Sequence, residues 1–414
     1  MKFLHIADCH LGGWKNEKIA GFAQAAFEKA LDLAIEKNVD AVFISGDIFD
    51  VPLPSLEVII KAMEKLKEVK ARGIEIFAIA GSHDIAINLG VINLLESAEI
   101  IKNVDFRKSQ DISYFFSGPL FVIGIEGKKR GREIAELEDF KNFIDRHKEA
   151  INKAECKVFL FHSSVKELID KRLEQYIETV SIDSIPELFD YFVFGHIHAN
   201  AILKKGEKFY VYPGPIFPTN FEEMESLKHG YCIVYDTKSQ KAEKIQLKVI
   251  DVVSMHFNAS GKTPSSLSNE IVKAIEAIDK QCIATLRIEG MLNGRVSEID
   301  FERIKKIAEE KGIIVLKNIS NLKSIEAEEV ELAIDASVST IEEIERKCIE
   351  SSLKKLDGTQ KKHIEEIIKD IISTFDKEKL EGETNAGFEK RLLEDAKKKE
   401  KSWLAIAEIF AKDK

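Results

Sequence analysis

The sequence has few cysteines and no long apolar run, and these absences exclude several classes of protein. Its five cysteines, at positions 9, 156, 232, 282 and 348, are scattered and form no CxxC pair. This distribution indicates reduced thiols rather than a disulfide framework or a zinc site. No stretch approaches the roughly 18 apolar residues of a membrane span. Asp8 also interrupts the first apolar run too early for a signal peptide. We therefore predict a cytoplasmic protein without membrane contact.

An excess of positive charge is also missing. The chain has 61 Lys and Arg residues against 71 Asp and Glu residues, so its formal net charge is −10. Because non-specific binding to a nucleic-acid backbone depends on positive charge, any such contact must use a local basic patch. One patch follows the apolar run 120–125 and consists of Lys128, Lys129, Arg130 and Arg132. It is either a solvated loop or a contact for backbone phosphates.

The length of 414 residues predicts two or three domains. Residues 1–249 alternate short β-rich runs with amphipathic stretches of helical length, which predicts βαβ units and a mostly parallel α/β sheet covered on both faces. The expected strands are 2–7, 40–45, 74–80, 120–125, 157–161 and 191–194. Residues 250–325 predict a small α+β module. Residues 326–414 are rich in Lys, Glu and Ile with helical periodicity, which predicts a helical tail.

Five polar clusters each follow directly on one of these strands. Ligands of open α/β sheets bind outside the carboxyl ends of the strands, so the clusters are expected to converge in one crevice. Carboxylate and imidazole ligands without thiolates suit Mn, Fe, Zn or Mg ions. One carboxylate can also bridge two ions about 3.5–4 Å apart, which is the arrangement used for phosphoryl transfer. The clusters are Asp8-Cys9-His10, Gly46-Asp47-Ile48-Phe49-Asp50, Gly81-Ser82-His83-Asp84, His162 and Gly195-His196-Ile197-His198.

The order DxH, GDxxD, GSHD, His and GHxH resembles the calcineurin-like metallophosphoesterases. More narrowly, HIADCHLG at 5–12, SGDIFD at 45–50 and GHIH at 195–198 resemble the Mre/SbcD double-strand-break repair nucleases. The resemblance covers residues 1–250 by motif and the remainder by layout. It implies a metallophosphoesterase fold of two packed β-sheets flanked by helices over 1–249. It further implies a DNA-capping α+β domain over 250–325 and a helical tail over 326–414.

The resemblance implies two metal ions per chain, with Mn2+ expected and Mg2+ or Fe2+ as alternatives. It assigns the first ion to Asp8, His10 and His198, and makes Asp47 the bridge to the second. His162, His196 and the residue at position 82 would complete the second ion's ligands. The family usually has Asn at this position, and this chain has Ser82. A hydroxyl is shorter and a poorer neutral ligand than an amide oxygen, so direct coordination and coordination through water both remain open.

The imidazole of His83 is the expected catalytic group. By resemblance it would not bind metal but would orient the scissile phosphate or protonate its leaving group. Asp84 would then hold the tautomer of His83. Asp50 either supports the site in the same way or only ends the strand–loop turn.

The function implied is a Mn-dependent DNA exonuclease and endonuclease of double-strand-break repair, associated with the nucleoid. The tail would bind a Rad-type ABC ATPase through Phe388, Trp403 and Phe410. A homodimer would form through helices that carry the apolar residues Leu56, Ile59, Ile60, Met63, Ile92 and Leu95. Two alternatives stay open. One is a phosphodiesterase or phosphatase for small molecules or nucleotides on the same fold, and the other is a degenerate phosphoesterase scaffold, for which Ser82 is the only support.

Overall fold

The computed structural model describes residues 1–85, 90–172, 174, 176–324, 368, 370, 371, 373, 374 and 388–399. These residues belong to two compact units. The first contains residues 1–256, 275–287 and 305–318, and the second contains residues 257–274, 288–304 and the described residues from 319 onward. Among the described residues, no helix combines the length and apolar composition needed to cross a membrane.

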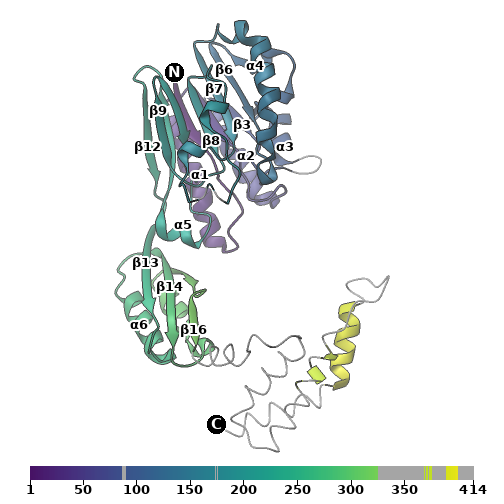
Figure 1. Ribbon diagram of the computed structural model, residues 1–414. Coiled ribbons are helices and arrows are strands. Elements are labelled where there is room, and N and C mark those ends of the chain that lie inside the picture. Colours follow the sequence, from purple (N-terminus) through teal and green to yellow (C-terminus); the bar gives the residue numbers. More distant parts are fainter. Residues whose placement is uncertain are drawn as a thin grey trace, which may run out of the picture. The chain divides into compact units, whose positions relative to one another are not determined.

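Two six-stranded sheets form the framework of residues 1–247 (Figure 1). The first has the order β12-β11-β1-β2-β3-β4, with β1 to β4 parallel to one another. The second has the order β5-β6-β7-β8-β10-β9, with its four central strands parallel. The first sheet comprises β1 (Lys2–Ile6), β2 (Ala41–Ser45), β3 (Glu75–Ile79), β4 (Lys102–Asn103), β11 (Gly230–Asp236) and β12 (Lys241–Leu247). The second comprises β5 (Phe116–Ser117), β6 (Leu120–Ile125), β7 (Cys156–His162), β8 (Tyr191–Gly195), β9 (Ala201–Lys205) and β10 (Lys208–Tyr212).

Alternate residues of the parallel strands belong to two different hydrophobic cores. Phe3 and Phe43 pack in a core shared with strands of the second sheet, whereas Leu4 and Val42 pack in a core shared with helices. This alternation follows from the two-residue repeat of a strand, whose successive side chains point to opposite faces. Strands buried on both faces explain why these segments are almost continuously apolar. The expected metallophosphoesterase arrangement of two packed sheets flanked by helices is confirmed.

Helices cover the sheets where the sequence predicts amphipathic stretches. The longest begins after Asn16, whose side chain accepts hydrogen bonds from the backbone N–H groups of Lys18 and Ile19. Such a cap satisfies N–H groups that have no partner within the helix. Its apolar face, which includes Ala23 and Phe27, is buried. The helices are α1 (Glu17–Glu36), α2 (Leu56–Ala71), α3 (Val91–Ser97), α4 (Leu137–Ile151) and α5 (Phe221–Ser226).

Residues 251–324 form the elements of the predicted α+β module. A four-stranded sheet has the order β13-β14-β15, with β16 also paired to β14. The strands are β13 (Asp251–Asn258), β14 (Cys282–Leu292), β15 (Ile314–Asn318) and β16 (Leu322–Ser324), and the helices are α6 (Pro264–Glu276) and α7 (Phe301–Glu310). In the tail, residues 388–399 are helical. Most other residues of the predicted tail lie outside the described residues.

Candidate metal centre

The strand-end clusters of the sequence converge at the carboxyl ends of both large sheets. Asp8 and Asp47 follow β1 and β2 of the first sheet, and Ser82 and His83 follow β3. His162 ends β7 of the second sheet, and His196 and His198 follow β8. The side chains of Asp8, Asp47 and His162 are almost completely buried. The site is therefore built from the two sheets together.

The first cluster consists of Asp8, His10 and His198, whose ligand-capable atoms lie within 4.8 Å of one another. The two imidazole Nε2 atoms are 3.1 Å apart. One carboxylate oxygen of Asp8 accepts a hydrogen bond from the backbone N–H of His196 at 2.9 Å. The other, Oδ2, is buried without a hydrogen-bond partner. Buried carboxylate oxygens normally accept a hydrogen bond. Because Oδ2 of Asp8 accepts none, it is available to bind a cation.

The second cluster consists of Asp47, His162 and His196, again within 4.8 Å of one another. Oδ2 of Asp47 lies 3.2 Å from Nε2 of His162 and 3.9 Å from Nε2 of His10. The same oxygen thus faces one imidazole of each cluster. Oδ1 of Asp47 accepts the backbone N–H of His83 at 2.8 Å, which fixes the direction of the carboxylate.

Three imidazoles are oriented by acceptors at their Nδ1 atoms. The partner of His10 is Oδ1 of Asp50 at 3.2 Å, and the partner of His162 is the carbonyl oxygen of Ser45 at 2.8 Å. His198 faces Oε1 of Glu223 at 2.8 Å. Because carboxylates and carbonyls accept, each Nδ1 is the donor, and in the neutral form of each ring Nε2 carries the lone pair. This arrangement is typical of histidines that bind metal through Nε2.

These observations fit a pair of metal ions. The lone pairs of His10 and His198 converge at 3.1 Å, which requires a proton or a cation between them. Nε2 of His162 is buried without a hydrogen-bond partner. Burial lowers the pKa of His162, but the carboxylates of Asp47 and Asp8 outweigh it and raise the pKa to about 10. The pocket therefore has a negative potential that favours a bound cation.

The backbone at this site adopts conformations that are unfavourable for side-chain-bearing residues. Asp8, His10, Asp47 and His196 have φ angles of 51°, 43°, 51° and 93°. Non-glycine residues with positive φ cost free energy, and they gather where a functional geometry is required. The turns after β1, β2 and β8 thus direct these side chains toward one another.

Glycines make room for the imidazole of His162. A Cβ atom placed on Gly46 would lie 2.3 Å from its Nδ1, and one on Gly127 would lie 2.3 Å from its Cδ2. Gly195 would bring a Cβ to 2.9 Å from Nδ1 and to 2.0 Å from the carbonyl oxygen of Ser45. Gly127 belongs to none of the motifs, and its contact with His162 was not expected from the sequence.

The structure corrects the expected contact between His83 and Asp84. Asp84 is buried and accepts the backbone N–H groups of Ile48, Phe49 and Gly81 at 2.9 to 3.2 Å. Asp84 therefore connects the loops after β2 and β3 by hydrogen bonds, and it does not orient the imidazole of His83. Nδ1 of His83 donates to the carbonyl oxygen of Asp50 at 2.7 Å.

His83 is the exposed imidazole of the site, with 47% of its side chain accessible. His83, His10 and Asp50 also have ligand-capable atoms within 4.8 Å of one another. Glu223 was missed by the sequence reading because it lies in α5, after a looped segment rather than at a strand end. The only signal for it was its place in the acidic first turn of that helix.

A pocket of about 360 Å³ lies beside the clusters. It is lined by Asp50, Val51, Pro52, Ser82, His83, Lys128, Lys129, Arg130 and His196. The structure thus brings most of the predicted basic patch to the same pocket as the candidate catalytic imidazole. Lys128 also pairs with Glu136. Arg132 is exposed and is not among the residues that line the pocket.

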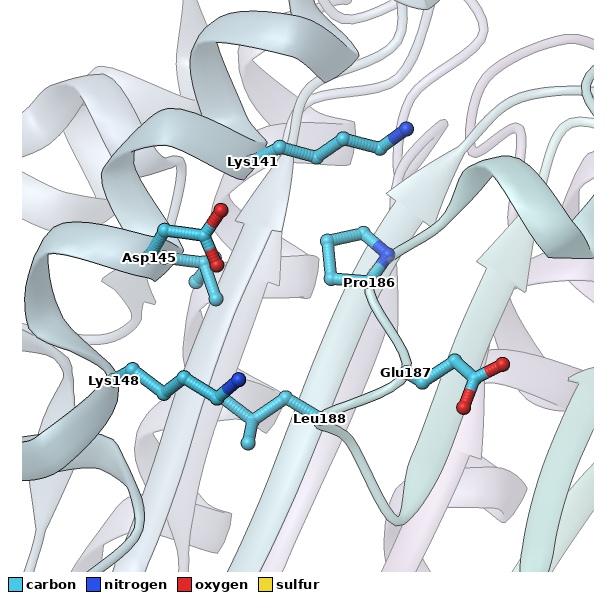
Figure 2. Close-up of a pocket in the computed structure, with 7 residues that line it drawn as sticks. Lys141, Asp145, Lys148, Pro186, Glu187 and Leu188 are labelled. Atoms are coloured by element: carbon cyan, nitrogen blue, oxygen red, sulfur yellow. The ribbon is translucent and has the colours of Figure 1, made fainter.

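Another pocket, of about 420 Å³, lies between α4 and the segment before β8 (Figure 2). Lys141, Asp145 and Lys148 of α4 line one side, and Pro186 and Leu188 line the other. This pocket is near the amino end of β8, whereas the clusters follow its carboxyl end. It therefore belongs to the opposite end of the second sheet.

Of the predicted partner-binding residues, Phe388 lies in the helical segment 388–399 and is half-buried. The guanidinium of Arg391 lies 5.3 Å from the centre of its ring. Trp403 and Phe410 lie outside the described residues.

Comparisons with known proteins agree with this fold. Residues 1–200 match the family model described as calcineurin-like phosphoesterase. The chain is 25% identical to the DNA double-strand break repair protein Mre11 of Archaeoglobus fulgidus, over 96% of this chain and 95% of that protein. It is 26% identical to Mre11 of Methanococcus maripaludis, over 78% of this chain and 89% of that protein. With Mre11 of Sulfurisphaera tokodaii the identity is 30%, over 49% of this chain and 50% of that protein.

The matched region contains β1 to β8 and all six residues of the two clusters. A family of this kind implies a dinuclear metal site, and the two clusters supply candidate ligands for it. Residues 1–200 therefore match the calcineurin-like phosphoesterase family, within a chain that is similar over most of its length to archaeal Mre11 proteins.

Proposed function

We propose that this chain is a two-metal, Mn-dependent DNA nuclease, with exonuclease and endonuclease activity, that acts in double-strand-break repair. The observation that carries the proposal is the pair of carboxylate–imidazole clusters beside a pocket lined with Lys129 and Arg130. The similarity to Mre11 proteins over most of the chain supports DNA as the substrate.

Asp8, His10 and His198 would hold one ion, and Asp47, His162 and His196 the other, with Ser82 completing the second site. Asp47 is proposed as the bridge because its Oδ2 faces His10 and His162 at 3.9 and 3.2 Å. Bound ions would lower the pKa of a nucleophilic water and neutralise the charge of the phosphate. The chain's own part is to fix the ligand directions through Asp50, Ser45 and Glu223.

His83 is proposed as the catalytic acid. Its Nδ1–H donates to the carbonyl of Asp50, so the ring is oriented without using Nε2. In the imidazolium form, Nε2–H can protonate the oxygen that leaves when the phosphodiester is cleaved. The exposure of this ring suits a group that contacts substrate, since His10 and His162 are buried and His196 and His198 are half-buried.

The acidic chain needs local positive charge to hold DNA. Lys128, Lys129, Arg130 and Arg132 are proposed to supply it, because three of them line the pocket that contains His83. Contacts to phosphates position a duplex without reading its sequence, so this surface is expected to bind DNA of any sequence.

The decisive experiment measures cleavage of end-labelled and internally labelled DNA with Mn2+, with Mg2+ and with a chelator, in parallel with bis-p-nitrophenyl phosphate. We expect DNA cleavage that requires Mn2+ and is lost in Asp47→Ala. Hydrolysis of the small diester alone would favour a small-molecule phosphodiesterase. Metal binding without either activity would favour a degenerate scaffold.

Two protein contacts are also proposed. The tail would bind a Rad-type ABC ATPase, with Phe388 as one anchor and Trp403 and Phe410 as others. Phe388→Ala should weaken capture of a co-expressed ATPase of this type, whereas Lys390→Ala, an exposed change on the same helix, should not. Equal capture by both variants would contradict the role of Phe388.

A homodimer is proposed to form through α2. Leu56 and Ile60 are 76% and 52% exposed, whereas Ile59, Ile92 and Leu95 are buried and belong to the core. Exposed large apolar side chains on one helix are typical of a protein contact. Ile60→Asp should halve the mass measured by sedimentation, and an unchanged mass would contradict a dimer at this surface.

A further inference from the structure

The side chains of the basic patch differ in whether they form ion pairs. Lys128 is half-buried and pairs with Glu136, a carboxylate that also binds Arg107. Lys129 and Arg130 are exposed and line the pocket with Ser82, His83 and His196. In the part of the chain that the structure describes, no ion pair is found for either. Their charges therefore remain available to a ligand in the pocket.

The backbone that presents these two side chains has a specific conformation. Arg130 and Gly131 have φ angles of 63° and 65°, which places two successive residues in the left-handed region. An arginine in that region is strained, because its Cβ comes close to the backbone. The surrounding contacts must offset this strain, and they are made by residues on both sides of the turn.

Three contacts hold the segment 127–133 against the metal centre. The backbone N–H of Gly127 donates to the carbonyl of Ala80, just before Ser82 and His83, at 2.9 Å. The Cα of Gly127 packs so closely on the ring of His162 that no Cβ fits between them. Glu133 is 2% exposed and provides the third contact.

Glu133 joins the basic segment to the end of β7. Its Oε1 accepts the hydroxyl of Ser163, the residue after His162, at 2.6 Å. Its Oε2 accepts the backbone N–H of Lys128 at 3.1 Å. The position of the two free basic side chains is thus fixed relative to the candidate ligand His162 by one buried carboxylate.

We propose that Lys129 and Arg130 form a subsite for a second phosphate of a polynucleotide, next to the phosphate at the metal clusters, and that Glu133 is its positioning residue. This inference rests on the proposed nuclease function and specifies how the site selects its substrate. A polynucleotide places phosphates at regular intervals, so a second one can bind beside the first. A small diester has one phosphate and cannot occupy the subsite. The subsite therefore increases the affinity for polynucleotides and not the affinity for small diesters.

The test compares Lys129→Gln/Arg130→Gln with the double control Arg72→Gln/Lys153→Gln, which removes the same two charges from exposed positions elsewhere. With Mn2+, we expect the subsite variant to raise the KM for labelled DNA by ~10-fold and to reduce the salt dependence of DNA affinity by a slope of about 1. Hydrolysis of bis-p-nitrophenyl phosphate should be unchanged. The control should resemble the wild type with both substrates.

Glu133→Gln tests the positioning role. A glutamine has one acceptor oxygen for two donors, so the segment should lose one of its contacts. We expect a higher KM for DNA, with kcat, metal content and hydrolysis of the small diester close to wild type. Equal loss on both substrates would show a general structural role and overturn the positioning role.

Unchanged KM and salt slope in Lys129→Gln/Arg130→Gln would overturn the subsite, provided that the wild type cleaves DNA. If the wild type does not cleave DNA, the proposed nuclease function itself fails. The two failures are therefore distinguishable within one set of measurements.

Discussion

Nδ1 of His198 lies 2.8 Å from Oε1 of Glu223, which ties a candidate metal ligand to a carboxylate outside every strand-end motif. Glu223 is itself held in place, because its Oε2 accepts the backbone N–H and the hydroxyl of Thr219, each at 2.9 Å. The loop before α5 therefore sets the tautomer and direction of His198.

Removing the carboxylate of Glu223 should weaken metal binding. In Glu223→Ala, His198 loses its Nδ1 acceptor, and we expect Mn2+ affinity to fall ~10–100-fold, the usual effect of losing such a partner. Glu223→Gln should be intermediate, because its amide oxygen can still accept. Titration calorimetry measures both variants, with Glu222→Gln, exposed in the same helical turn, as the control. Equal affinities throughout would contradict the role of Glu223.

Asp47 should be the most costly ligand to lose. Its Oδ2 faces an imidazole of each cluster, so Asp47→Ala should reduce bound metal at both sites and abolish cleavage of DNA. Elemental analysis of the purified protein gives the metal content, and circular dichroism checks the fold. Two ions retained in this variant would show that Asp47 is not the bridge.

His83→Gln should separate catalysis from metal binding. The ring is exposed and is oriented by the carbonyl of Asp50, and it belongs to neither of the two clusters, so its loss leaves them intact. We expect kcat for DNA to fall by ~10²-fold or more, with metal content and DNA affinity unchanged. A parallel fall in metal content would instead make His83 a ligand.

Ser82→Asn should improve the second metal site. The amide oxygen is longer-reaching and a better neutral ligand than a hydroxyl, and Ser82 lines the pocket beside His196. The Mn2+ concentration for half-maximal activity should fall. An unchanged requirement would mean that the side chain at this position contributes little to the second ion.

Gly127→Ala should displace His162. The added Cβ would lie 2.3 Å from Cδ2 of the ring, so the imidazole must leave its position beside Asp47 or the backbone at Gly127 must shift. We expect weaker binding of one ion, measured by elemental analysis across a Mn2+ titration. Gly21→Ala is the matched control, since it lies on α1 with no atom within 4 Å of the new Cβ. Wild-type metal binding in Gly127→Ala would show that the ring tolerates the displacement.

Much of the fold and the site could be predicted because the relevant signals are local. Strands buried on both faces must be continuously apolar, and ligands that leave the ends of parallel strands must follow them directly in sequence. Asp8 and Asp47 follow such apolar strands within two residues, and His162 ends one. The strand β9 was not predicted, because it carries exposed residues such as Lys204 and lacks a continuous apolar run.

The contacts that were missed depend on segments far apart in the chain. Glu223 meets His198 across a loop, and Gly127 meets His162 from a neighbouring strand end. The error at Asp84 has the same origin. Its position beside His83 suggested an imidazole partner, but the turn directs its carboxylate to the backbone N–H groups of Ile48, Phe49 and Gly81.

Each candidate cluster takes side chains from both large sheets. The first combines Asp8 and His10 of one sheet with His198 of the other, and the second combines Asp47 with His162 and His196. If these clusters hold ions as proposed, each ion would cross-link the two halves of the sandwich. Resistance to heat and denaturant would then rise with free Mn2+, because an ion that binds only the folded chain stabilises it by mass action. The catalytic centre would then also stabilise the packing of the two sheets, and removal of the ions by a chelator would weaken that packing.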